Sequence, residues 1–207
     1  MRLKSFSIEN FRGYKDTVTI NMSDLTVFVG RNDIGKSTIL EALDIFFNDK
    51  SAISPIEYAD INKEALASGD EETVFTAVFD NLPSSIIIDE TVTTTLQDEK
   101  LLDSNSCLTV VKKFQGASKL KTFIKANHPN NPECNNLLLL KISELKNKAK
   151  DLTCTDRTQK SLLRKAIWNH YSDNLQLSER EIDTTGDGLK DIWQKLERYL
   201  PIYSLFQ

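Results

Sequence analysis

The sequence predicts an α/β fold built around a strand, a glycine-rich loop and a helix that follow one another along the chain. The loop is Gly30-Arg31-Asn32-Asp33-Ile34-Gly35-Lys36-Ser37-Thr38, which fits the G-x-x-x-x-G-K-[ST] phosphate loop at every fixed position. The apolar residues 25–29 precede the loop and predict a buried strand. Residues 39–47 follow it with apolar side chains at helical spacing. This order of elements indicates a P-loop nucleotide-binding fold.

The residues of the loop explain why it would bind phosphate. Gly30 and Gly35 accept backbone torsions that are closed to other residues. Consecutive backbone N–H groups can then surround an anion at the positive end of the following helix. We expect Lys36 to reach the β- and γ-phosphates and the Ser37 hydroxyl to ligate Mg²⁺. No Asn-Lys-x-Asp guanine motif occurs in the chain, so ATP is favoured over GTP.

The remaining elements predict a β-subdomain followed by a helical arm. Patterns of alternation and turn residues predict strands over 2–8, 17–20 and 72–79, short helices near 61–67 and 93–103, and a hairpin of 107–114 and 120–126. Apolar residues at spacings of four and three then predict helices from Leu138 to Leu152, over 158–171 and over 188–199. We therefore expect a lobe over 1–127 and a helical arm or insertion over 128–200. Residues 201–207 would begin a returning core strand in a chain that ends inside a domain.

Composition bounds the class of protein. The chain has 207 residues, of which 40% are hydrophobic, enough for a substantial core. No apolar run has the length of a membrane span, and the alternating N-terminus differs from a signal peptide. Cys107, Cys134 and Cys154 lack metal-ligand spacing, which favours thiols in a reducing cytoplasm. The sequence thus predicts a cytoplasmic protein with no membrane partner.

The charge is unevenly distributed along the chain. Residues 44–103 carry 3 Lys/Arg and 14 Asp/Glu, a net charge of 3 − 14 = −11. Residues 104–165 carry 13 Lys/Arg and 4 Asp/Glu, a net charge of 13 − 4 = +9. Such blocks indicate either a face that binds a polyanion or solvated faces that attract each other.

Two short motifs resemble functional sites without meeting their requirements. The run Ile86-Ile87-Ile88-Asp89-Glu90 resembles a Walker B strand, but no Ser-Gly-Gly signature lies just upstream and polar residues follow. The run from Asp183 to Gly188 resembles a calcium loop, but Gln194 stands at the twelfth position, where a glutamate is required. A turn before the last helix explains this second run better.

The N-terminal region resembles a known group of ATPases. The run is Leu3-Lys4-Ser5-Phe6-Ser7-Ile8-Glu9-Asn10-Phe11-Arg12-Gly13-Tyr14. With the phosphate loop and residues 37–43, it resembles the start of ABC-type ATPases that act on DNA, including structural-maintenance-of-chromosomes and RecF-type proteins. The form of the loop, with Asp33 where a third glycine usually stands, is most similar to the overcoming-lysogenization-defect (OLD) family of ATP-dependent nucleases. The resemblance is specific over 1–47, weaker over 73–126 and only topological over the arm.

This resemblance implies roles for the matching residues. Asn32, Asp33, Ile34, Gly35, Lys36, Ser37 and Thr38 would wrap the triphosphate, beside Gly30 and Arg31. Arg12 would approach the nucleotide, although a solvated turn arginine is the alternative. In this group ATP lies between two heads, which implies a homodimer or higher oligomer, with DNA as a partner. The signature motif, the Walker B acid, the switch histidine and the Toprim nuclease domain are not visible in these 207 residues.

Three functions remain open from the sequence. The first is the ATP-binding part of an OLD-like, DNA-directed ATPase in phage defence or DNA repair, whose isolated 207 residues we expect to be inactive. The second is a non-enzymatic module in which nucleotide gates dimerisation. The third is a small-molecule kinase, which ranks last because residues 44–103 contain no arginine to form a lid. DNA would bind through the lysine-rich hairpin and the arm, with an affinity that falls steeply with salt.

Overall fold

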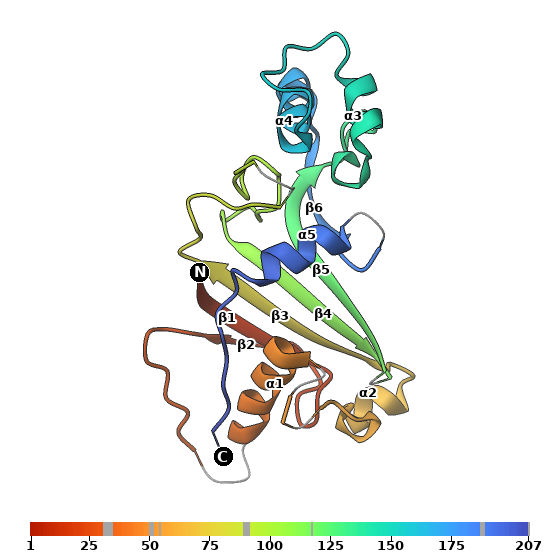
Figure 1. Ribbon diagram of the computed structural model, residues 1–207. Coiled ribbons are helices and arrows are strands. Elements are labelled where there is room, and N and C mark those ends of the chain that lie inside the picture. Colours follow the sequence, from red (N-terminus) through yellow and green to blue (C-terminus); the bar gives the residue numbers. More distant parts are fainter. Residues whose placement is uncertain are drawn as a thin grey trace. The chain divides into compact units, whose positions relative to one another are not determined.

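The computed structural model describes residues 1–30, 35–49, 52–53, 55–88, 92–116, 118–186 and 189–206. It confirms the α/β class. Six strands form a sheet in the order β2-β1-β3-β4-β5-β6 (Figure 1). The strands are β1 (Arg2–Glu9), β2 (Val18–Asn21), β3 (Glu72–Asp80), β4 (Leu108–Gln115), β5 (Lys119–Pro129) and β6 (Leu177–Asp183). The α-helices are α1 (Lys36–Asn48), α2 (Lys63–Ala67), α3 (Ile142–Lys148), α4 (Lys160–His170) and α5 (Lys190–Glu197), with 3₁₀ turns η2 (Tyr58–Asp60), η3 (Leu137–Leu139) and η4 (Ser172–Asn174).

The chain divides into two compact units. The first comprises residues 1–80, 110–122 and 201–207, and the second comprises residues 81–109 and 123–200. Strands β4 and β5 contribute residues to both. None of the helices in the described ranges is both long enough and apolar enough to cross a bilayer.

An aromatic cluster forms the core of the first unit. Strand β1 pairs antiparallel with β2 on one side and with β3 on the other. Their alternation turns Phe6 and Phe75 toward helix α1, where Phe46 meets the Phe6 ring at 5.6 Å between centroids. Phe11 closes the cluster against Phe75 at 5.1 Å. Because these rings are almost fully buried, they fix the position of α1 on the strands.

The C-terminal residues of the chain lie along α1 in the same unit. Tyr203 stacks on Phe47 with 5.8 Å between ring centroids, and its hydroxyl donates to the carbonyl of Leu40 at 2.9 Å. The amide of Asn48 donates to the carbonyl of Tyr203 at 3.4 Å. Residues 201–206 nevertheless form no strand of the sheet.

The second unit is organised around the β5–β6 pair and two helices. Strand β6 pairs antiparallel with β5, from Phe123 opposite Asp183 to Pro129 opposite Leu177. Helix α4 buries Trp168, whose indole N–H donates to the carbonyl of Cys134 at 3.0 Å. It also buries Arg164, which forms an ion pair with Glu99 at 2.7 Å; both side chains are 1% exposed.

Several predicted elements differ from the structure. Residues 25–29 are not a buried strand: they lie outside the sheet, with Leu25, Val27 and Val29 exposed by 80%, 68% and 90%. A strand needs a hydrogen-bonded neighbour, and no described residue pairs with this segment. The helix predicted over 93–103 is a series of turns, and the helix predicted from Leu138 to Leu152 is divided into η3 and α3.

Other elements are confirmed or had not been predicted. The hairpin of β4 and β5 is confirmed, although β5 continues through Pro129, beyond the predicted end at residue 126. Helices α1, α2, α4 and α5 also correspond to predicted helices. Strand β6 had not been predicted. The domain boundary between residues 127 and 128 stays a prediction.

The two charge blocks neutralise each other in part. Among the described residues, four ion pairs join a residue of the basic block to one of the acidic block, at N–O distances up to 3.9 Å: Lys112–Asp49, Lys113–Glu72, Arg164–Glu99 and Lys165–Asp98. The uneven charge distribution is therefore explained in part by ion pairs within each unit, and the residues of the basic block outside these pairs form its charged surface.

Candidate nucleotide-binding site

The candidate site lies at the N-terminus of α1, where the phosphate loop ends. Gly35 precedes the helix in the left-handed conformation, with φ 72° and ψ 15°. Lys36 is the first helical residue, and its ammonium donates to the carbonyl of Gly30 at 2.6 Å, across the loop. Gly35 has no side chain that could cap the helix, and the first N–H groups of an α-helix have no partner within the helix. Arg31, Asn32, Asp33 and Ile34 lie outside the described residues.

The next two residues, Ser37 and Thr38, differ in exposure. Ser37 is exposed, whereas Thr38 is buried against the core with 9% exposure. An exposed hydroxyl in the first helical turn suits Mg²⁺, which keeps several waters and takes one or two protein oxygens beside phosphate oxygens. The described residues contain no cluster of three His, Cys, Asp or Glu side chains suited to a metal.

A tight turn after β1 stands beside the helix. Asn10 and Arg12 both have positive φ, at 51° and 49°. The buried Asn10 side chain donates to the carbonyls of Asp70 and Glu72, at 3.3 and 3.1 Å, and accepts from the N–H of Asn62 at 3.1 Å. These bonds satisfy the amide and hold the turn in a conformation that non-glycine residues adopt infrequently.

Arg12 is held by two carboxylates rather than by solvent. Its Nε donates to Asp60 Oδ1 and its Nη1 to Glu41 Oε2, both at 2.7 Å. Partial burial lowers the pKa of Arg12, but the bonds with Asp60 and Glu41 outweigh it and leave the pKa raised. Because Glu41 lies on α1, this pair ties the turn to the helix that carries the phosphate loop. The solvated alternative therefore does not describe Arg12 here, and a nucleotide role stays a prediction.

Tyr14 also belongs to the site, although sequence reasoning gave it no role. Its hydroxyl donates to the carbonyl of Gly35 at 3.4 Å. A β-carbon placed on Gly35 would lie 3.0 Å from the same hydroxyl oxygen, closer than ordinary packing allows. Tyr14 follows a glycine at the end of a turn, and nothing in its local pattern signals this contact. The tyrosine thus adds a tight contact to the torsional reason for glycine at this position.

Comparisons with known proteins found a family match and partial relatives. A family described as an AAA ATPase domain matches residues 1–207. One uncharacterised protein of Methanocaldococcus jannaschii is 40% identical over 72 residues, 35% of this chain and 20% of that protein. Another from the same organism is 35% identical over 52 residues, 25% of this chain and 24% of that protein. The chain thus covers a quarter or less of either relative.

A solved structure also shows a limited likeness. It comes from a study titled "Structural biochemistry of ATP-driven dimerization and DNA stimulated activation of SMC ATPases", with a TM-score of 0.42 and 16% identity, covering 60% of this chain and 69% of the other. The family match, by contrast, extends over the full length of the chain. The protein belongs to the AAA ATPase domain family.

Proposed function

We propose that this chain is the ATP-binding portion of a DNA-directed, ABC-type ATPase of the OLD kind, acting as an ATP-dependent nuclease in phage defence or DNA repair. The observation that carries the proposal is the N-terminus of α1, where Gly35 leaves the helix uncapped and Lys36 reaches across the loop to Gly30. A bound triphosphate would supply the phosphoanhydride that the complete protein cleaves, with Mg²⁺ as its counterion.

The residues of the chain would divide the work of binding. Lys36 would exchange the carbonyl of Gly30 for phosphate oxygens, while the N–H groups from Gly35 onward donate to the same anion. The Ser37 hydroxyl would hold the metal. Arg12 could keep its bond to Glu41, or it could exchange Glu41 for a phosphate oxygen. In the second case the bond from its Nε to Asp60 would still hold the side chain in place.

Calorimetry tests the nucleotide assignment. Titration of Mg–ATP into the chain should give heat with wild type and no saturable heat with Lys36→Ala. Lys63→Ala is the matched control, because Lys63 begins the short helix α2 and should leave the heat unchanged. Equal heats for wild type and Lys36→Ala would sink the phosphate-loop assignment.

We also propose that DNA is a partner of the complete protein. Only part of the basic block is available to contact DNA phosphates. Lys112 is buried, Lys113 contacts Glu72, and Lys125 pairs with Glu179 at 2.8 Å. Lys119 and Lys121 remain exposed on the hairpin. These two lysines are therefore the first candidates for phosphate contacts on this unit.

A salt series distinguishes such contacts from mutual neutralisation. We expect the affinity of the full-length protein for duplex DNA to fall steeply with salt, and the slope to decrease by about 2 when Lys119 and Lys121 are both changed to Gln. The pair Lys113→Gln and Lys125→Gln serves as the control with equal charge change. Binding that does not depend on salt, or equal slopes for both double variants, would count against the hairpin as a DNA contact.

A further inference from the structure

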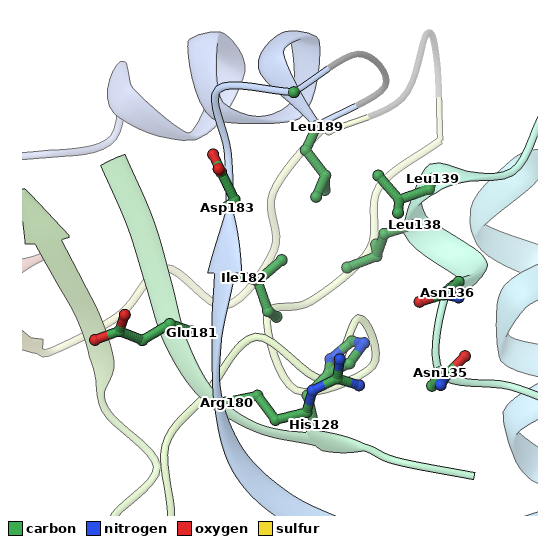
Figure 2. A pocket seen from close by; sticks show the side chains of 11 residues that line it. His128, Asn135, Asn136, Leu138, Leu139, Arg180, Glu181, Ile182, Asp183 and Leu189 are labelled. Carbon is green, nitrogen blue, oxygen red and sulfur yellow. The ribbon is translucent and has the colours of Figure 1, made fainter. Parts of the chain in front are cut away.

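A pocket in the second unit lies outside the nucleotide site. It is a cavity of about 400 Å³ between the end of β5, strand β6, the turn η3 and the start of α5 (Figure 2). Its apolar part is formed by four aliphatic side chains, Leu138, Leu139, Ile182 and Leu189. Its polar part is formed by His128, Asn135, Asn136, Arg180, Glu181 and Asp183. A volume of this size lies within the range of ligand pockets and has room for an inserted side chain together with part of a peptide backbone.

The pocket is bounded by the edge of a strand as well as by side chains. Four consecutive residues of β6, Arg180 to Asp183, line it. Successive residues of a strand point to opposite faces, so one cavity touched by all four must also contact the backbone between them. Figure 2 shows this alternation: Arg180 and Ile182 point toward η3, and Glu181 points the other way. In the sheet, β6 is the last strand, with no further strand beside it among the described residues.

The polar groups of the pocket include one guanidinium, that of Arg180. Arg180 donates through Nη1 to the carbonyl of Pro129 at 3.2 Å. Burial lowers the pKa of His128, which favours an uncharged ring beside Arg180. The C=O of a peptide group placed in the pocket could accept a hydrogen bond from Arg180.

We propose that β6 and this pocket bind an extended peptide from a partner protein, which adds a strand to the edge of β6 and inserts one large aliphatic side chain between Leu138, Leu139 and Leu189. Main-chain hydrogen bonds to β6 give such a site its affinity, and the pocket selects the side chain. Exposure supports the entry of that side chain, because Leu139 is 46% exposed at the rim while Leu138 and Leu189 form the floor at 5% and 4%.

Charge favours a foreign peptide over a second copy of this chain. Strand β6 carries three acidic residues, Glu179, Glu181 and Asp183, and one basic residue, Arg180; because Glu179 pairs with Lys125 of β5 at 2.8 Å, these five side chains together carry a net charge of −1. Pairing β6 with itself would bring these acidic residues together, and like charges across strands oppose association. A peptide with Lys or Arg beside its aliphatic residue instead complements the strand.

Selection from a random heptapeptide display library tests the proposal on the full chain. We expect enriched peptides to share one Leu, Ile or Met with a neighbouring Lys or Arg. Their affinity should fall at least tenfold for Leu139→Ser and stay unchanged for Ile87→Ser, which alters an aliphatic side chain of similar exposure, 41%, outside both β6 and this pocket. Backbone N-methylation of an enriched peptide at alternate residues should weaken binding by a similar factor, because it removes strand hydrogen bonds.

Three results would overturn the proposal. Selection that enriches no peptide sensitive to Leu139→Ser would exclude the pocket. Enriched peptides that bind equally well after N-methylation would exclude strand addition. Sedimentation that shows a dimer of wild type and a monomer of Leu139→Ser would make a second copy the occupant. Circular dichroism of both serine variants must match wild type, so that loss of binding is not loss of fold.

Discussion

The two ends of helix α1 are stabilised in opposite ways. At its N-terminus, Gly35 supplies no capping side chain and Ser37 is exposed. At its C-terminus, Lys112 from β4 is 2% exposed and donates to the carbonyl of Phe46 and to Asp49, which has φ 44°. The last carbonyls of a helix lack partners within the helix, and here a buried ammonium supplies one. The C-terminal end of α1 is thus closed, meaning that a side chain caps it, whereas the N-terminal end is open, without a capping side chain from Gly35, where a phosphate would bind.

The largest expected effect comes from opening the closed end. Lys112→Met should lower the free energy of unfolding by about 2 kcal/mol, because the buried carbonyl of Phe46 loses its donor. Urea denaturation followed by circular dichroism measures this change. Lys113→Met is the matched control: its ammonium lies 3.9 Å from Glu72 at a more exposed position, and we expect a change below about 0.5 kcal/mol. Equal losses for the two variants would mean that the cap contributes nothing specific.

The helices and strands of the protein differ in how well the sequence predicts them. Helix α1 and the β4–β5 hairpin follow from local periodicity and turn residues, and both are confirmed. Strand β6 carries four charged residues among seven, so its sequence lacks the apolar alternation that predicts a strand. It forms a strand because it pairs with β5, a contact that the local sequence does not show. Residues 25–29 show the opposite case: their apolar sequence predicts a buried strand, but the segment is exposed. An apolar run is buried only where another part of the chain covers it.

The residues of the candidate site also differ in how well the sequence predicts them. Gly35 and Lys36 are recognisable from the motif because their spacing is itself the local geometry. The partners of Arg12 are not, because Glu41 and Asp60 lie 29 and 48 residues away in the chain. Tyr14 reaches Gly35 across 21 residues. Contacts of this kind depend on how β1, α1 and η2 pack, which no short sequence window contains.

A smaller effect is expected from closing the open end. Gly35→Ala places a β-carbon at φ 72°, where left-handed torsion costs about 1 kcal/mol, and 3.0 Å from the Tyr14 hydroxyl. Gly69→Ala is the control for torsion alone, since Gly69 has φ 87° and no atom within 4 Å of an added β-carbon. We expect both variants to lose stability in urea, but only Gly35→Ala to weaken Mg–ATP binding in calorimetry. Unchanged ATP affinity for Gly35→Ala would contradict a functional role for the open end.

The smallest expected effect isolates the contact between Tyr14 and Gly35. Tyr14→Phe alone removes a long hydrogen bond of 3.4 Å and should change the free energy of unfolding by less than about 0.5 kcal/mol. In the Gly35→Ala background the same change removes the atom nearest the new β-carbon, while the next ring atoms stay at 3.4 and 3.5 Å. The double variant should therefore be more stable than the sum of the single changes by about 0.5 kcal/mol, measured as a double-mutant cycle in urea. Strict additivity would show that torsion alone, and not the tyrosine, excludes a side chain at the start of the helix.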